Sequence, residues 1–254
     1  IFLSVLPIWH SFERAVEYVV LSLGVAIAYS KPIGKVMLKD FEEIRPTWMT
    51  AVPRIWEGIR GGILHNINSQ GGIKKALFYF FLDIGTAFSY LKNMFLGYLP
   101  TFRRRFRVID TTLSALPLLL LSPLQGLGNL LVFGKIKKRL GGRFVAGVSG
   151  GGALPPYVDS FYQAAGIKLL EGYGLTETGP ILSVRLQHAP VGGTVGPLLR
   201  DIEYRLLNEN SREVGPGRIG NLFVKSDQVM QGYYKKPEET EKVLSDGWLD
   251  TGDL

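Results

Sequence analysis

Cysteine is absent from the 254 residues of the chain, and histidine occurs only as His10, His65 and His188. The absence of cysteine excludes a disulfide framework, a thiolate nucleophile and a zinc site of the cysteine type. A metal bound by this chain is therefore expected to have oxygen ligands. Hydrophobic residues make up 46% of the chain, which is enough to build a folded core and excludes a disordered tail. The length fits one large domain or two small ones.

Acidic residues are scarce in the first part of the chain. Residues 1–148 contain 19 Lys and Arg against 8 Asp and Glu, whereas the remainder contains 10 against 14. The imbalance is concentrated in residues 74–148, where 12 basic residues stand against only Asp83 and Asp110. A segment with this excess of positive charge is typical of one that lies beside an anionic neighbour.

Residues 111–134 form a run of 24 uncharged residues, which satisfies the length criterion for a transmembrane helix. Pro117 and Pro123 interrupt the run, and each proline removes a backbone donor that hydrocarbon does not replace. We therefore favour a helical hairpin over a true span. The sequence leaves open whether this hairpin is buried in the protein or lies in a membrane interface. The interface is suggested by the basic residues that flank the run, namely Arg103, Arg104, Arg105, Arg107, Lys135, Lys137, Lys138 and Arg139.

The chain opens on an apolar run, residues 1–8, that has neither a basic leader nor a small-residue cleavage site. We therefore do not interpret it as a signal peptide. Both ends are expected to be internal to a longer chain, because the first residue is Ile1 and no polar tail follows residues 250–254.

Glycine and proline recur at short intervals after Gly142, between runs rich in β-branched residues. Residues 143–148 predict a strand, residues 155–165 a helix and residues 167–170 a second strand. Two strands joined by one helix form a right-handed parallel unit, so the expected fold class is α/β, with mixed and parallel sheets flanked by helices. The alternating residues from 201 onward predict antiparallel strands.

Two loops that contain glycine follow the two predicted strands. Residues 149–153 read Ser-Gly-Gly-Gly-Ala, which lets backbone N–H groups approach a flat or anionic ligand, although such loops also serve only as tight turns. After the second strand, Tyr173 offers an aromatic face, Thr176 a hydroxyl and Glu177 a carboxylate suited to Mg²⁺. Because ligands bind at the carboxyl ends of parallel strands, this combination predicts a nucleotide site. The alternative is a turn that Thr176 and Glu177 merely cap.

Two further polar residues stand outside these loops. Asp253 follows Gly252, and a carboxylate there is able to accept two hydrogen bonds from a ribose diol, although a turn aspartate is the commoner role. His10 follows Trp9. A lone histidine in this position is more often a packing residue, and no recognisable arrangement for activating a nucleophile accompanies it.

Six segments, taken in order, carry a family resemblance. They read LPIWHSFER at 6–14, PT at 46–47 with VPR at 52–54, SGGGAL at 149–154, GYGLTE at 172–177, VMQGYY at 229–234 and GWLDTGD at 247–253. Together they resemble the AMP-forming acyl-CoA synthetases over essentially the whole chain. The fourth and the last segments are the most specific, and the first two are most similar to the long-chain fatty acid branch.

The resemblance implies roles for individual residues. Thr176 would hydrogen-bond phosphate, Glu177 would ligate Mg²⁺, and His10 would lie by the acyl pocket and the reacting carboxylate. Tyr173 would pack on adenine, and Asp253 would hold the ribose hydroxyls. The complete nucleotide-binding set that the resemblance implies is Gly151, Gly152, Ala153, Gly172, Tyr173, Gly174, Thr176 and Asp253, with Thr176, Glu177 and His10 as the catalytic set.

The reaction implied by the resemblance is the activation of a long-chain fatty acid. ATP and Mg²⁺ would convert the acid to acyl-AMP with release of pyrophosphate, and CoA, as co-substrate, would then form the thioester. Two alternatives stay open: adenylation of another carboxylate or transfer to a carrier-protein thiol, and a non-catalytic membrane or lipid-binding protein. The expected partners are the fatty acid, ATP, CoA and an anionic membrane surface, with no nucleic acid. The expected location is cytoplasmic, peripheral on the inner face of a membrane if the basic segment binds lipid.

The resemblance also implies a domain layout. Residues 1–254 would form a partial AMP-binding domain, part of the large N-terminal domain of an adenylate-forming enzyme. Within it we expect a helical insertion at 73–142, a nucleotide-binding βαβ region at 143–200 and a β-rich region at 201–254. The family's phosphate loop and catalytic lysine lie outside these residues, so this chain alone is expected to be inactive. Gly152, where many relatives have Ala, and Asn221, in place of a usual Glu, depart from the family pattern.

Overall fold

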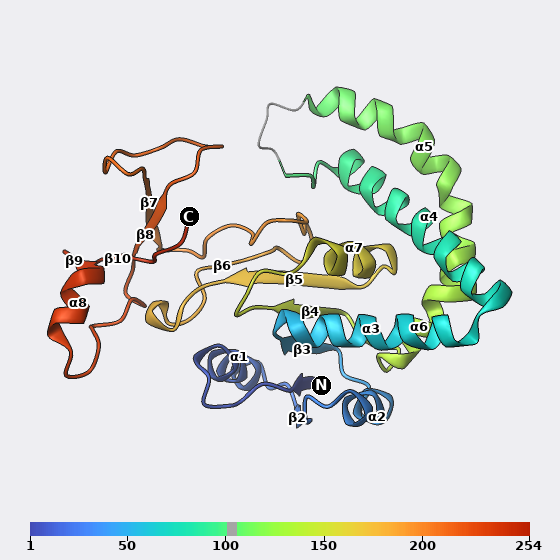
Figure 1. The fold of residues 1–254 in the computed structure, drawn as a ribbon, viewed down its shortest axis with the longest axis horizontal. Coiled ribbons are helices and arrows are strands. Elements are labelled where there is room, and N and C mark those ends of the chain that lie inside the picture. Colours follow the sequence, from blue (N-terminus) through green and yellow to red (C-terminus); the bar gives the residue numbers. More distant parts are fainter. Residues whose placement is uncertain (101–105) are drawn as a thin grey trace.

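The computed structural model of the chain describes residues 1–100 and 106–254. Its main sheet has the strand order β2-β1-β3-β4-β5-β6 (Figure 1). The strands are β1 (Phe2–Ser4), β2 (Ile27–Tyr29), β3 (Trp48–Ala51), β4 (Ala146–Ser149), β5 (Lys168–Tyr173) and β6 (Ser183–Val184). All neighbouring pairs from β2 to β5 are parallel, and β6 is antiparallel to β5. The predicted α/β fold class with a mixed, mainly parallel sheet is confirmed.

Helices connect the parallel strands, because a parallel pair needs a crossover longer than a hairpin turn. They are α1 (Ser11–Ser22), α2 (Gly34–Ile44), α3 (Pro53–Gln70), α4 (Gly72–Leu96), α5 (Arg107–Gly128), η1 (Asn129–Phe133), α6 (Gly134–Arg139) and α7 (Pro156–Ala164). Pro53 and Pro156 each begin a helix, where the missing N–H costs nothing because it would have no intrahelical partner.

The register of the sheet brings three connecting loops to one edge. Ala51 of β3 pairs with Ser149 of β4, and Ser149 pairs with Glu171 of β5. The residues that follow these strand ends therefore lie side by side, at the edge where ligands bind in parallel sheets. Strand β5 continues to Tyr173, three residues beyond the predicted end at Leu170, because its last residues pair with β6.

The main hydrophobic core is built from aromatic residues of the crossover helices. Trp56 of α3 is fully buried and packs edge-on against Tyr162 of α7, whose hydroxyl donates to the Trp56 carbonyl at 2.9 Å. Phe78 and Phe133 extend this core to α4 and η1. The helices 72–139 are thus continuous with the core of the sheet rather than separate from it.

Helices α4 and α5 form a long antiparallel hairpin that extends along one end of the molecule (Figure 1). The hairpin is attached through α4, which contacts α7 so closely that a Cβ on Gly85 would lie 2.7 Å from the Ala164 carbonyl oxygen. Helix α5 runs through Pro117 and Pro123 without ending, although the sequence indicated that these prolines interrupt the run. Leu113 and Leu119, whose carbonyls lose an N–H partner to the prolines, are exposed, so water is available to those carbonyls.

A second sheet lies at the opposite end of the molecule from the hairpin (Figure 1). It is antiparallel, with the order β7-β8-β10-β9, and comprises β7 (Glu203–Leu207), β8 (Asn221–Lys225), β9 (Leu244–Ser245) and β10 (Trp248–Asp250), with α8 (Pro237–Val243) beside it. A small core of Leu182, Val224 and Leu249 joins it to the main sheet, and Tyr173 packs against that core. The antiparallel pairing predicted from residue 201 onward is therefore present.

Candidate active site

A cavity of about 390 Å³ lies at the carboxyl ends of β4 and β5, against the start of α1. Its apolar walls include Phe12, Val16 and Val148. The predicted site residues that line it are His10, Gly151, Gly172, Tyr173, Gly174, Thr176 and Glu177. The fold thus brings together residues from positions 10 to 177, and the volume falls within the usual range of small-molecule sites.

Three predicted residues do not line this cavity. Gly152 and Ala153 follow Gly151 in the same loop and are exposed. A Cβ on Gly152 would meet only Pro53 Cγ, at 3.9 Å, so the position has room for a methyl group. The third, Asp253, belongs to the segment after β10 and meets the cavity through Tyr173.

His10 is placed by the first turn of α1. It is the N-cap of that helix, and its Nδ1 accepts a hydrogen bond from the Phe12 N–H at 3.3 Å. An accepting Nδ1 leaves the proton of a neutral imidazole on Nε2, which is then a donor for a ligand in the cavity. From the sequence, packing was the commoner role expected of a lone histidine. In the structure the His10 side chain caps α1 and lines the cavity.

Helix α1 is fixed to the sheet by a buried carboxylate. Glu13 is fully buried and accepts a hydrogen bond from the Thr50 hydroxyl of β3. Burial raises the pKa of Glu13, because removal from water disfavours the charged form. Ser4 of β1 donates to the Glu17 carboxylate at 3.2 Å. These contacts hold the start of α1, and with it His10, against the carboxyl ends of β1 and β3.

Glu177 belongs to the turn η2 (Thr176–Thr178), which begins three residues after the end of β5. The Tyr233 hydroxyl donates to Glu177 Oε1 at 2.9 Å, and the Glu177 carbonyl accepts from the Met230 N–H at 2.8 Å. The pKa of Tyr233 is raised chiefly by this hydrogen bond to Glu177. Beside Glu177, the Thr176 hydroxyl lies 3.3 Å from that of Ser11. A phosphate or metal–phosphate group entering the cavity would therefore meet two hydroxyls and one carboxylate.

Tyr173 and Asp253, which the sequence assigned to one nucleotide, are bonded to each other. The Tyr173 hydroxyl donates to Asp253 Oδ2 at 2.7 Å. Burial, followed by the hydrogen bond to Asp253, raises the pKa of Tyr173 to about 12, so the phenol is neutral at physiological pH. The Asp253 backbone is fixed in turn, because its carbonyl accepts from the Leu222 N–H of β8 at 2.9 Å.

The carboxylate of Glu177 suits a magnesium ion shared with a bound ligand better than a metal ion held by protein side chains alone. Among the described residues no group of three or more His, Cys, Asp or Glu is close enough to hold a metal ion. Mg²⁺ commonly keeps several waters and binds through one or two carboxylates together with the phosphates of a substrate. Glu177, partly exposed at the cavity, meets that requirement. The residues present therefore fit a magnesium ion that arrives with a nucleotide.

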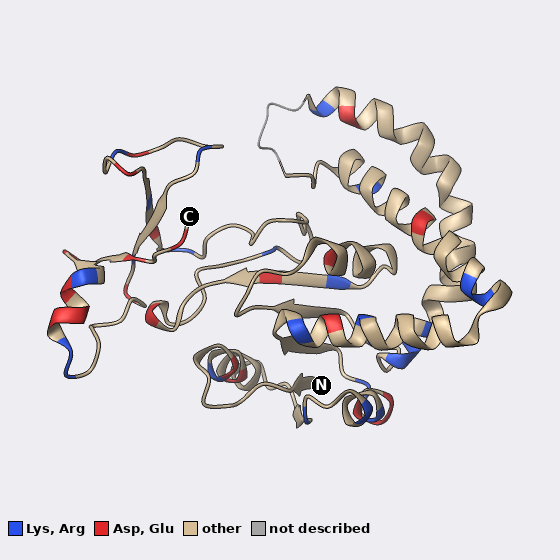
Figure 2. Ribbon diagram, in the orientation of Figure 1, with Lys and Arg blue, Asp and Glu red and all other residues tan. Residues whose placement is uncertain are grey.

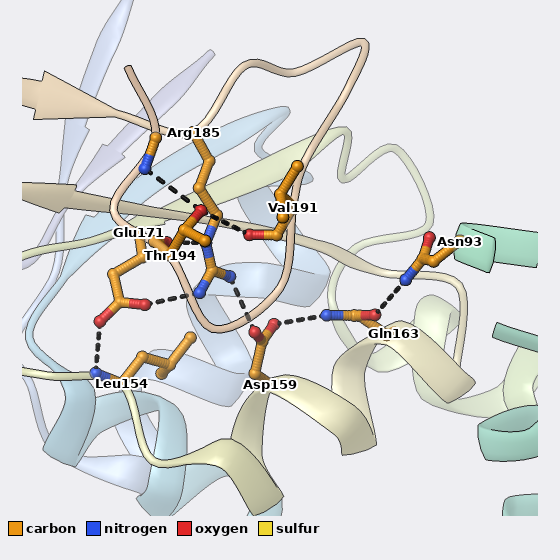
Figure 3. A network of polar contacts seen from close by, with 9 residues as sticks. Asn93, Leu154, Asp159, Gln163, Glu171, Arg185, Val191 and Thr194 are labelled. Carbon is orange, nitrogen blue, oxygen red and sulfur yellow. Dashed lines mark hydrogen bonds and ion pairs between the residues drawn. The ribbon is translucent and has the colours of Figure 1, made fainter. Parts of the chain in front are cut away.

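A buried cluster of charged side chains, formed by Arg185, Asp159 and Glu171, contacts the end of the glycine loop (Figure 3). The Arg185 guanidinium contacts Asp159 of α7 at 2.8 Å and Glu171 of β5 at 2.6 Å, and its side chain is 2% exposed. The Glu171 carboxylate also accepts from the Leu154 N–H at 2.7 Å. Leu154 directly follows Ala153, so the cluster ties the end of the loop to β5 and α7. Such pairing is what makes a buried charge tolerable.

Sequence reasoning missed several residues of this site. Tyr233 was part of a recognised motif, but nothing local indicated that it contacts Glu177, 56 residues away. Ser11 is next to His10 in the sequence, but its contact with Thr176, 165 residues away, has no local sequence signal. Arg185 gave no signal, because it belongs to no motif that the sequence reading identified. These contacts all depend on the topology of the sheets.

A larger apolar cavity, of about 660 Å³, lies beyond the carboxyl ends of β1 and β3. It is lined by residues of α2, α3 and α6, with Lys35, Arg54 and Arg139 among them. None of the predicted site residues lines it. The smaller cavity is therefore the one that contains the predicted chemistry.

Comparison with known proteins gives the same family along the chain. The family described as AMP-binding enzyme matches residues 1–234. Three relatives from Arabidopsis thaliana are the probable acyl-activating enzyme 16, chloroplastic (34% identical, 100% of this chain and 36% of the relative), the long-chain-fatty-acid–[acyl-carrier-protein] ligase AEE15, chloroplastic (34%, 99% and 35%), and long chain acyl-CoA synthetase 4 (31%, 100% and 35%). The chain thus spans about a third of the length of these relatives.

The fold is also shared with solved structures. The ATP-bound RpMatB-BxBclM chimera B3 superposes with a TM-score of 0.61 at 20% identity, over 99% of this chain and 37% of that one. This likeness shows the fold alone. The family match covers residues 1–234, which include strands β1 to β8 and every motif described above except the last, at 247–253. This protein belongs to the AMP-binding enzyme family.

Proposed function

We propose that the complete protein is a long-chain fatty acid–CoA ligase that uses ATP and Mg²⁺. The observation that carries this proposal is the cavity at the carboxyl ends of β4 and β5, where His10, Thr176 and Glu177 face apolar walls. A carboxylic acid with an apolar tail and a nucleotide with a charged phosphate end both find suitable surfaces there. The resemblance to long chain acyl-CoA synthetase 4 along the whole chain supports the same substrate class.

The nucleotide would lie across the glycine loop and the end of β5. Gly151, Gly152 and Ala153 would flank the adenine, Tyr173 would pack on it, and Asp253 would accept the ribose hydroxyls. Asp253 already accepts a hydroxyl hydrogen bond from Tyr173, which lines the cavity, and this supports a role for its carboxylate in accepting ribose hydroxyls. On ribose binding, a ribose hydroxyl would either replace the Tyr173 hydroxyl as the donor to Asp253 or donate to the other oxygen of the same carboxylate.

The phosphate end would lie toward η2. Thr176 would donate to the α-phosphate, and Glu177 would hold Mg²⁺, which neutralises phosphate charge when bound. His10 would lie by the reacting carboxylate, with its Nε2–H as a donor. The chain's own contribution is to hold the acid in line with the phosphate and to place donors where negative charge develops.

A second candidate differs only in the acceptor. The relative AEE15, 34% identical, is named for ligation of long-chain fatty acids to acyl-carrier protein. Transfer to a carrier-protein thiol is therefore a specific alternative to transfer to CoA. Both reactions share the adenylation step and the site described above.

The test is fatty-acid-dependent exchange between ATP and pyrophosphate, measured with the full-length protein over a panel of chain lengths and without a thiol. Exchange that rises with long acyl chains is the expected result, and no exchange with any fatty acid in folded protein would overturn the proposal. Adding CoA or acyl-carrier protein to the same reaction then identifies the acceptor. The isolated 254 residues are expected to give no useful exchange, because the phosphate loop and the catalytic lysine implied by the family lie outside them.

A further inference from the structure

The outer faces of α5 and of η1, which directly follows it, carry a long apolar stripe. Its residues recur every three to four positions, which places them on one side of the helix. The side chains of Leu116, Leu119 and Leu120 are 63%, 69% and 64% exposed. The stripe, as we define it, consists of the exposed residues Val108, Ile109, Leu113, Leu116, Leu119, Leu120, Leu124, Leu127, Leu130 and Leu131.

This helix is not an ordinary core helix. The continuous stretch Arg107–Arg139 is the one part of the described chain that is long and apolar enough to cross a membrane by length and composition. The core helix of a soluble protein satisfies the same criterion, but such a helix is mostly buried. In Arg107–Arg139 only 17% of the apolar window is buried. The opposite side of α5 packs on α4. An apolar surface of this length on a water-exposed helix marks an interaction site.

Basic residues stand at both ends of the stripe, with Asp110 three residues after the first of them. Arg107 begins α5 and is exposed, and Lys135 and Lys138 are exposed just after Leu131. A small groove brings Lys74 of α4 together with Leu131 and Lys135. Figure 2 shows most of the length of α5 without charged residues. Arg103, Arg104 and Arg105, which the sequence analysis grouped with this charge, lie outside the described residues.

We propose that the stripe of α5 inserts into the interfacial layer of an anionic lipid surface, with the basic residues at its ends contacting the headgroups. Apolar side chains flanked by lysine and arginine are the pattern of helices that lie in a membrane interface. A second copy of the chain fits less well as the occupant. Two stripes packed face to face, parallel or antiparallel, would bring their basic ends close together, and these ends would repel each other. Asp110 is the one acidic residue of α5 that would offset this repulsion.

The helix lies in the interface rather than spanning the bilayer. Helix α4 packs along α5, so a crossing would carry Asp83 and Lys92 of α4 into hydrocarbon. Pro117 and Pro123 also leave carbonyls on α5 without an N–H partner, which hydrocarbon does not satisfy. A shallow position keeps both sets of polar groups within reach of water or headgroups.

This inference does not require the proposed function, because lipid binding is measured without ATP, acid or thiol. The test is co-sedimentation of the full-length protein with vesicles of phosphatidylcholine alone or mixed with phosphatidylglycerol. The variant Leu116→Ser/Leu119→Ser/Leu120→Ser removes the centre of the stripe. Its matched control, Val19→Ser/Leu21→Ser/Leu23→Ser, changes side chains on and after α1 that are 58%, 60% and 71% exposed. A second pair compares Lys135→Gln/Lys138→Gln with Lys31→Gln/Lys35→Gln.

The wild-type protein is expected to bind the mixed vesicles and to bind them less well as salt is raised. The leucine variant should lose about tenfold or more in partition coefficient, and the Lys135/Lys138 variant a similar amount on mixed vesicles only. Both controls should bind like the wild type. Wild-type protein that stays in the supernatant overturns the proposal. A leucine variant that changes the oligomeric state and leaves vesicle binding intact overturns it in favour of a second copy.

Discussion

The hydroxyl of Tyr233 donates a hydrogen bond to Glu177 Oε1 across 2.9 Å. Glu177 is the candidate ligand for Mg²⁺, so in this structure a phenol occupies one of the oxygens that a metal would use. Tyr233 and Glu177 come from different parts of the chain, the segment before α8 and the turn after β5. If Glu177 holds Mg²⁺ through Oε1, as proposed, metal binding would release this tyrosine hydroxyl.

The first prediction is that Tyr233→Phe strengthens the apparent binding of Mg²⁺. The phenol competes with the metal for Glu177, and a hydrogen bond of this kind changes an equilibrium by about two- to tenfold. The concentration of Mg²⁺ that half-saturates pyrophosphate exchange should therefore fall by that factor in the full-length protein. Tyr234→Phe is the control, because Tyr234 is 85% exposed. A half-saturating concentration that is unchanged or higher in Tyr233→Phe would show that the phenol does not compete.

The second prediction concerns the charge of Glu177. Glu177→Gln keeps the size of the side chain and the backbone bond from Met230, but removes the negative charge that a divalent cation needs. We expect exchange to fall by about a hundredfold or more. Glu209→Gln, in an exposed turn, should have no effect. The same variants measured for vesicle binding should be indistinguishable from wild type. A wild-type protein that gives no exchange, and whose Glu177→Gln variant keeps its vesicle binding, would instead favour a lipid-binding protein without this catalytic site.

The third prediction is that Tyr173 loses its proton at a higher pH than an ordinary tyrosine. Its pKa is raised to about 12 from an ordinary value of 10.0, first by burial and then by Asp253. The fold therefore favours the neutral phenol, and the stability gained in this way is fully present below pH 10 and is lost as the pH rises toward about 12. Asp253→Asn removes the second cause only, so the pKa should fall part of the way toward 10.

Spectrophotometric titration of tyrosinate checks this third prediction, with Tyr173→Phe identifying the signal. Asp253→Asn should also raise the KM for ATP if the carboxylate holds the ribose. A Tyr173 phenol that titrates at its ordinary pKa in the wild-type protein would contradict the burial and the hydrogen bond seen here.

The sequence was sufficient for the parts of the fold that follow local rules. The short apolar run before Ser149, the helix beginning at Pro156 and the strand that begins near Ile167 follow from composition and spacing, and the parallel-strand rule then places Gly151 and Glu177 at one edge. The sequence was insufficient where contacts with residues distant along the chain determine the local structure. Pro117 and Pro123 suggest an interruption, but the packing of α5 on α4 and the exposure of the affected carbonyls allow the helix to continue.

Buried charge was the other limit of sequence reasoning. Arg185 occupies a region of loops and short strands, where an arginine is usually solvated. Only the folded topology shows that Asp159 of α7 and Glu171 of β5 converge on it. The same holds for Tyr233, whose motif was recognisable while its partner was not. Residues that act through long-range contacts are thus the ones that sequence reading missed in this site.

The fourth prediction tests the buried cluster of Arg185, Asp159 and Glu171. Arg185→Met leaves two buried carboxylates without their cation, which should lower the free energy of unfolding by about 3–5 kcal/mol. Adding Glu171→Gln and Asp159→Asn to this variant should recover part of the loss, because the uncompensated charges are then removed. Denaturant unfolding measures both effects. Lys242→Met, which breaks an exposed pair with Glu239 at 2.7 Å, should cost less than about 1 kcal/mol. Equal losses in Arg185→Met and Lys242→Met would mean that burial adds nothing to the Arg185 cluster.

The fifth prediction contrasts two glycines of the site. A Cβ on Gly174 would lie 2.0 Å from the Pro180 carbonyl oxygen and 2.9 Å from the Leu182 nitrogen, both backbone atoms. Gly174→Ala must therefore displace the segment after β5, and because Thr176 and Glu177 lie in that segment, exchange should fall by about tenfold or more. Gly152→Ala adds the same methyl group where the nearest atom, Pro53 Cγ, is 3.9 Å away, so its exchange rate should stay within about twofold of wild type. Thermal unfolding of both variants separates a displaced site from a lost fold. If Gly174→Ala retained full exchange, the close approach of Gly174 to Pro180 would not be what positions Glu177.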